Sequence, residues 1–164
     1  MQKGGKGFTF VELIRRRKGF SLIEAAMVVL FIGILAVVAI PRLNFAVISK
    51  YKAEAMAKKI VTDLRLTRRL AISEAANNTK GFELIMLGAG PYTGYKIENS
   101  DTMATVASHT IDSDVSVTGA VKFKFEPLGN LQTGGDLQLS VSAEGKSFTI
   151  TVIQATGAVK CAEN

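Results

Sequence analysis

The sequence predicts an α+β protein in which a long N-terminal helix packs on an antiparallel β-sheet head. Three observations predict this architecture. Residues 20–40 form an apolar segment of helical length, and residues 42–80 carry apolar side chains at helical spacing. Residues 81–164 then alternate apolar and polar side chains between glycine-rich turns, as strands do.

Positive charge is concentrated ahead of the apolar segment. Of the 20 basic and 14 acidic residues in the chain, six basic residues and one acidic residue lie in residues 1–19. The rest of the chain is therefore close to neutral. The net charge of +6 does not indicate a nucleic-acid-binding body, and nucleic acid is an unlikely partner on this ground.

The segment from Phe20 to Ile40 is expected to form a transmembrane helix. At about 1.5 Å per residue it matches a hydrocarbon core of about 30 Å. Four basic residues at positions 15–18 precede it, so the positive-inside rule predicts a cytoplasmic N-terminus and an outward C-terminal part. A cleaved secretory signal is the alternative, but this segment is longer than such a signal and no convincing cleavage site follows it.

One carboxyl group, that of Glu24, interrupts the apolar segment. A charge within the membrane is unfavourable unless it is paired, which argues against a plain anchor and makes Glu24 a candidate functional residue. If the chain were cut after Gly19, the new α-amino group of Phe20 would be a suitable partner on a neighbouring helix. Such a pair would fix the depth of each subunit, because a misplaced subunit leaves both charges unpaired.

The run Lys18-Gly19-Phe20-Ser21-Leu22-Ile23-Glu24, with the apolar segment behind it, resembles the leader of type IV pilins and type II secretion pseudopilins. The resemblance implies that a prepilin peptidase cuts after Gly19 and N-methylates Phe20. It also implies that Glu24 acts in assembly, that Pro41 bends the helix and that Gly33 loosens it.

A second run, Lys6-Gly7-Phe8-Thr9-Phe10-Val11-Glu12, repeats the cleavage-like pattern. No membrane-length apolar segment follows it, so cleavage there would leave a charged stub, and we expect it to be non-functional. A duplication or a start codon assigned upstream of the true one would explain it, and a role in recognition is the alternative.

Residues 42–80 are expected to form an amphipathic helix that ends in the run Asn77-Asn78-Thr79-Lys80-Gly81. Basic residues alternate with acidic ones along it, which favours a solvated, packed helix over a nucleic-acid-binding stripe. The apolar positions at helical spacing are Phe45, Ile48, Ala55, Met56, Ile60, Leu64, Ala71 and Ile72.

Residues 81–164 are expected to form the head, with alternation typical of antiparallel strands that have one solvated face. The candidate strands are Phe82–Leu87, Tyr92–Ile97, Val115–Thr118, Val121–Phe125, Leu137–Val141, Phe148–Ile153 and Ala158–Cys161.

This C-terminal half resembles the GspH/FimT group of minor pseudopilins, notably at Phe125-Glu126-Pro127-Leu128-Gly129 and in its last strands. Cys161 is the single cysteine, so the C-terminal disulfide usual in major pilins cannot form. The tail from Lys160 to Asn164 is not basic, which counts against members of the group that take up DNA with a basic tail.

No catalytic constellation is recognisable, so the chain is not expected to be an enzyme or to hold a cofactor or metal. His109 is expected at the surface, and Cys161 is expected to be an inert thiol, with an intermolecular disulfide as the alternative. Asp112 and Asp114 offer too few oxygen ligands to predict a calcium site.

The resemblance implies a minor pseudopilin, a structural subunit of a type II secretion pseudopilus. The alternative is a minor type IV pilin of FimT type in pilus assembly or DNA uptake, and a membrane-anchored periplasmic enzyme is disfavoured. Expected partners are other pilin or pseudopilin subunits, met through the N-terminal helices, together with prepilin peptidase and inner-membrane lipid.

The expected organisation follows from these assignments. It comprises a cleaved leader (1–19), a transmembrane half-helix (20–41), an amphipathic half-helix (42–80) and a periplasmic head (81–164). We therefore expect a single-pass protein of the bacterial inner membrane.

Overall fold

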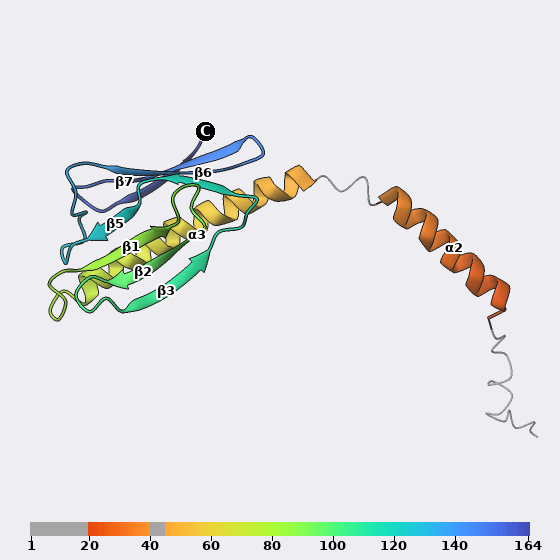
Figure 1. The fold of residues 1–164 in the computed structure, drawn as a ribbon, viewed down its shortest axis with the longest axis horizontal. Coiled ribbons are helices and arrows are strands. Elements are labelled where there is room, and N and C mark those ends of the chain that lie inside the picture. Colours follow the sequence, from red (N-terminus) through yellow and green to blue (C-terminus); the bar gives the residue numbers. More distant parts are fainter. Residues whose placement is uncertain (1–19, 40–44) are drawn as a thin grey trace, which may run out of the picture. The chain divides into compact units, whose positions relative to one another are not determined.

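The computed structural model describes residues 20–39 and 45–164, which fall into two compact units, residues 1–43 and 44–164. The first unit contains helix α2 (Leu22–Ala39), and the second contains helix α3 (Phe45–Ser73) followed by the strands (Figure 1). Gly19 and Pro41, which the sequence assigns to cleavage and to a helix bend, lie outside the described residues.

Helix α2 is apolar around its whole circumference. Every side chain from Leu22 to Val37 is exposed, and Glu24 in the first turn carries the one charge of the helix. The carboxylate is favourably placed there, because the unpaired N–H groups at a helix N-terminus create a partial positive charge. No helix within residues 20–39 and 45–164 is long and apolar enough to cross a membrane.

Helix α3 is amphipathic and buries one face in the head. The predicted apolar positions Ile60, Leu64 and Ala71 are fully buried, whereas Ile48, Ala55 and Ile72 are exposed, so that part of the prediction is wrong. The buried stripe is centred on smaller side chains, which let the helix approach the strands closely. Its members are Ala53, Ala57, Ile60, Val61, Leu64, Thr67 and Ala71.

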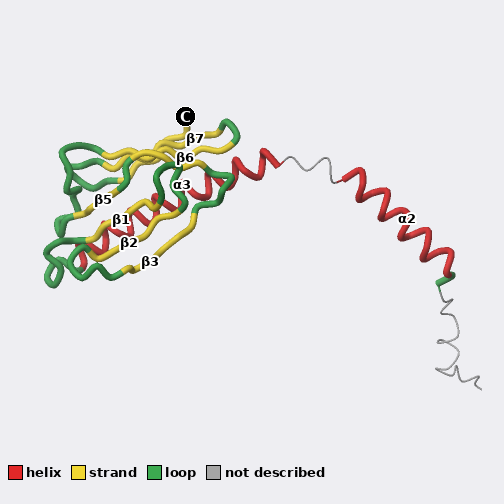
Figure 2. Tube along the Cα trace, in the orientation of Figure 1, coloured by secondary structure: helices red, strands yellow, loops and turns green. Residues whose placement is uncertain are grey.

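The described strands form two four-stranded antiparallel sheets rather than the one predicted sheet (Figure 2). The first sheet has the order β3-β2-β1-β5 and the second the order β4-β6-β7-β8. The bounds are β1 (Phe82–Leu87), β2 (Gly94–Asn99), β3 (Thr105–Thr110), β4 (Ser116–Gly119), β5 (Lys122–Phe125), β6 (Leu137–Ala143), β7 (Lys146–Val152) and β8 (Val159–Glu163).

Strand β1 has the predicted bounds, and six further strands overlap their predicted ranges, whereas β3 was not predicted. Strand β3 lies at the edge of the first sheet, and most of its side chains are exposed. It therefore lacks the apolar alternation that marks a strand with one buried face.

Helix α3 contacts both sheets, and the hydrophobic core lies between these three layers. Phe82, Tyr95, Phe123 and Phe125 are the largest buried side chains of the first sheet, and Leu139 and Ile150 are buried on the second. Truncating a buried phenylalanine to alanine removes about 3–5 kcal/mol of stability. All the residues of this core belong to α3 or to the segments that follow it, so the second unit has a core of its own.

Two glycines hold the end of α3 against the loops of the head. Gly157 has φ +63°, and a Cβ atom on it would lie 1.8 Å from the carbonyl oxygen of Gly129. The Nε–H of Arg68 donates to the same oxygen at 3.0 Å. Only a residue without a side chain permits this approach, so Gly157 fixes where the two loops meet the helix.

Candidate assembly interface

The start of helix α2 brings Phe20 and Glu24 to one end of the helix. The backbone N–H groups of Glu24 and Ala25 both donate to the carbonyl oxygen of Ser21, at 2.9 and 3.1 Å. Ser21 therefore occupies the cap position, and the spacing Ser21-x-x-Glu24 is that of a capping box. The structure places the predicted new terminus at Phe20 within one turn of the predicted assembly carboxylate.

Sequence reasoning identified Glu24 by its charge but missed its position in the first turn. In the first turn a carboxylate is stabilised by the partial positive charge of the helix N-terminus, which reduces the free energy needed to bury it. The signal was present in the sequence, because a serine three residues before a glutamate commonly begins a helix.

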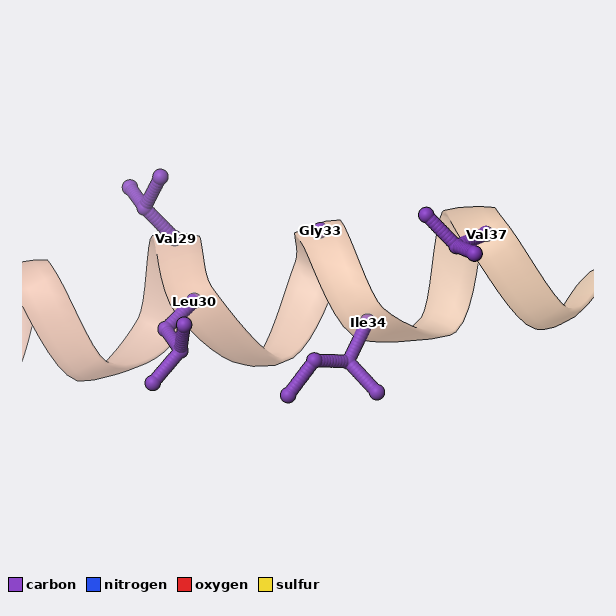
Figure 3. A pocket seen from close by; sticks show the side chains of 5 residues that line it. All are labelled: Val29, Leu30, Gly33, Ile34 and Val37. Carbon is purple, nitrogen blue, oxygen red and sulfur yellow. The ribbon is translucent and has the colours of Figure 1, made fainter.

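Gly33 leaves a hollow on the surface of α2. The hollow is lined by Val29, Leu30, Gly33, Ile34 and Val37, and Figure 3 shows Val29, Gly33 and Val37 along one side of the helix. A Cβ atom on Gly33 would meet no atom within 4 Å, so packing within the described chain does not require glycine there. Glycine inside a helix destabilises it by about 1 kcal/mol relative to alanine, and nothing within the described chain offsets this. Close packing of a partner helix at the hollow would offset it.

In the head, the amino group of Lys52 lies between two carboxylates. Its Nζ atom is 2.9 Å from Asp112 and 2.6 Å from Asp114. The hydrogen bond from Lys52 holds the pKa of Asp112 below its usual value, and the hydrogen bonds to Asp114 and Asp112 raise the pKa of Lys52. A lysine thus occupies the place that a cation would take, and the described residues contain no cluster of three acidic, histidine or cysteine side chains suited to a metal.

His109 lies at the surface, as predicted, on the edge strand β3, but it is only partly exposed and has a partner. Its side chain is 29% exposed, and its Nε2 atom lies 3.5 Å from a carboxylate oxygen of Asp63 on α3. The hydroxyl of buried Tyr95 donates to the same oxygen at 2.6 Å, and burial together with this bond raises the pKa of Tyr95. The cluster ties α3 to the first sheet, because Asp63 lies on α3 while Tyr95 and His109 lie on the neighbouring strands β2 and β3.

Two buried glutamates face each other on the first sheet, Glu83 on β1 and Glu98 on β2. Lys122 Nζ lies 2.6 Å from Glu83, and Lys96 contacts Glu98. Oxygen Oε2 of Glu98 accepts no well-directed hydrogen bond, even though Lys96 lies beside it. Each carboxylate thus has a lysine beside it, the condition under which buried charge is tolerated.

Cys161 lies exposed on the edge strand β8. Desolvation raises the pKa of its thiol, although Arg65 and Lys58 oppose this effect. A raised pKa reduces the thiolate fraction at neutral pH and with it the reactivity of the thiol. The expectation of an inert thiol at Cys161 stays a prediction.

The head, with its helix packed across two antiparallel sheets, has the fold of type IV minor pilins and minor pseudopilins. Among solved structures the chain is similar to the type IV minor pilin FimU of Pseudomonas aeruginosa strain PAO1 in two crystal forms. The TM-scores are 0.57 and 0.54, at 15% and 16% sequence identity. The likenesses cover 68% and 66% of this chain and 89% and 91% of FimU.

The chain is also similar to the minor pseudopilin EpsH from the type 2 secretion system of Vibrio cholerae. The TM-score is 0.50 at 11% identity, over 68% of this chain and 97% of EpsH. No protein-family model and no curated protein matches the sequence. The likenesses, all at 16% identity or less, establish the fold of the head.

Proposed function

We propose that this chain is a structural, non-enzymatic subunit of a pilin-like filament in the bacterial cell envelope. The observation that carries the proposal is helix α2, an apolar helix with exposed side chains that precedes a head of minor-pilin fold. So large an apolar surface is stable only when lipid or another apolar helix covers it. The hollow at Gly33 provides a position at which a second helix can approach closely.

The proposed life history begins with cleavage after Gly19 by a prepilin peptidase and N-methylation of Phe20. The 21-residue segment from Phe20 to Ile40 then lies in the inner membrane, with the head in the periplasm. In the assembled filament, Glu24 pairs with the amino terminus of a neighbouring subunit, and this pairing sets the register of the helices.

Within this class we favour a minor pseudopilin of a type II secretion system, which is what EpsH is. The basis for this preference is the resemblance of the C-terminal half to the GspH/FimT pseudopilins. A minor type IV pilin in pilus assembly or DNA uptake is the second candidate, and the higher TM-score to FimU favours it.

Deletion of the gene tests the proposal and separates the two candidates. We expect loss of extracellular type II cargo with surface pili and twitching motility unchanged, and restoration by the full-length chain. A fragment of residues 44–164, which lacks the leader and α2, is the matched control and is expected not to restore secretion. Loss of pili with normal secretion would establish the second candidate. A strain with both systems intact would contradict the proposal.

A further inference from the structure

Helix α3 presents an outer face opposite its buried stripe. We define this outer face by Val47, Ile48, Tyr51, Lys59, Arg65 and Arg69, all of which are exposed. At 100° per residue these positions fall within about 60° of a common line along the helix, and the buried stripe lies on the other side. The beginning of α3 extends past the ends of the strands (Figure 1).

Lys58 also projects from this outer face and pairs with Glu54 at 2.7 Å, whereas Lys59, Arg65 and Arg69 have no acidic partner among the described residues. Within residues 20–39 and 45–164, Lys59 and Arg69 form no ion pair, and Arg65 donates to the neutral carbonyl of Val159 at 3.3 Å. Thr62, Arg65, Leu66 and Arg69 line a shallow hollow at the centre of the face.

Of the acidic residues that interrupt the basic run, Glu54 borders the outer face and is neutralised by lysines, whereas Asp63 is turned toward the first sheet. Glu54 accepts from Lys58 at 2.7 Å and from Lys146 at 3.0 Å, and these bonds lower its pKa. Asp63 points to Tyr95 and His109. The outer face therefore carries a net positive charge, on a helix that is solvated on one side and packed on the other, as predicted.

Exposed apolar and aromatic side chains share the face with these cations. Val47 is 41% exposed, Ile48 45% and Tyr51 68%. The face thus carries aliphatic side chains and a tyrosine in the first turns of α3 and basic side chains further along, and both kinds are found in helices that lie in the interface of a bilayer.

We propose that the outer face of α3 rests on a lipid surface bearing anionic headgroups. Lys59, Arg65 and Arg69 attract the headgroups, while Val47, Ile48 and Tyr51 enter the interfacial region. A nucleic acid would engage the cations but would leave the aliphatic side chains exposed. A second copy using the same face is disfavoured, because like charges would oppose each other. The inference rests on the proposed function only in requiring that the head lies near a membrane.

The test uses residues 44–164, whose core lies wholly within this unit, in vesicle co-flotation. We expect binding to phosphatidylglycerol/phosphatidylcholine vesicles that weakens with added salt, and little binding to pure phosphatidylcholine. Since each basic residue near an anionic surface contributes roughly a fivefold change in affinity, Arg69→Glu is expected to lower vesicle affinity at least about fivefold. The double variant Lys59→Glu/Arg69→Glu should abolish binding, and Tyr51→Ser should weaken it without changing its salt dependence.

Lys80→Glu is the matched control, because it makes the same charge change in the loop after the helix and breaks only an exposed pair with Asp101. Its affinity should stay within about twofold of wild type. Thermal unfolding of each variant verifies that the head remains folded.

Three outcomes would overturn the proposal. They are equal loss of binding in Arg69→Glu and Lys80→Glu, tighter binding to duplex DNA than to anionic vesicles, and self-association through the outer face without vesicle binding. Because the fragment lacks the leader and α2, any of these results would leave cleavage and filament assembly untouched. Failure of the proposed function would likewise leave vesicle binding by the fragment unchanged.

Discussion

Glu24→Ala is expected to leave cleavage after Gly19 intact and to exclude the chain from filaments. The glutamate lies in the first turn of a helix whose other side chains are apolar, so removing it does not disturb the apolar surface. What is lost is the proposed pair with a neighbour's amino terminus. Removing one member of a buried ion pair is unfavourable by about 3–5 kcal/mol, a factor of about a hundred or more in an association constant.

Co-purification of the subunit with cross-linked filament components measures this loss, and immunoblotting for the shorter mature chain verifies cleavage. Glu24→Gln should fail in the same way, since it keeps the size of the side chain but not the charge. Glu74→Ala, on an exposed residue after α3, should incorporate normally. Normal incorporation of Glu24→Ala would show that the carboxylate does not pair in the filament.

Gly157→Ala is expected to destabilise the head more than most single substitutions. The new Cβ atom would lie 1.8 Å from the carbonyl oxygen of Gly129, which Arg68 also contacts, so the loops must separate from the end of α3. The positive φ of Gly157 adds backbone strain. We expect a loss of about 3 kcal/mol or more, which lowers the melting temperature of a domain of this size by roughly 10 °C.

Thermal unfolding of residues 44–164 by circular dichroism measures the effect, and two other glycines separate its causes. Gly134→Ala has open space and no positive φ, so it should be nearly neutral. Gly145→Ala has φ +78° but meets no atom within 4 Å, so it should show only the strain of about 1 kcal/mol. A Gly157→Ala head as stable as Gly134→Ala would contradict the described contact between the loops.

Local pattern predicted the elements of this fold better than it predicted their arrangement. The periodicity of α3 and the alternation in β6 were sufficient because each depends on neighbouring residues. The division into two sheets depends on pairings between distant strands, such as β1 with β5 and β4 with β6, which no local period specifies. Strand β3 was missed because its exposed position at an edge removes the need for apolar residues.

The candidate site, like the fold, could be predicted from the sequence only in part. Glu24 was identifiable because a charge in an apolar segment is anomalous wherever the helix lies. The contact of Lys52 with Asp114 joins residues 62 positions apart, and that of His109 with Asp63 crosses from an unpredicted strand to a helix. Such contacts follow from the packing of α3 on the sheets, and the sequence does not determine that packing locally.

The basic face of α3 shows a limit of a different kind. Alternation of Lys, Arg, Asp and Glu along the sequence favoured a solvated, packed helix, but it does not say which charges share a face, because residues three or four apart do so while adjacent ones do not. Asp63 therefore lies away from the line that carries Arg65 and Arg69 and accepts from Tyr95, whereas Glu54 borders that line and is paired with Lys58 and Lys146.

The central claim is that the chain becomes a filament subunit by cleavage between Gly19 and Phe20. N-terminal sequencing of the chain isolated from bacterial membranes tests it most directly. Our account predicts a mature protein that begins at a methylated Phe20. A mature protein that still begins at Met1 and keeps the arginine run at positions 15–17 would contradict it, because Glu24 would then have no new amino terminus with which to pair.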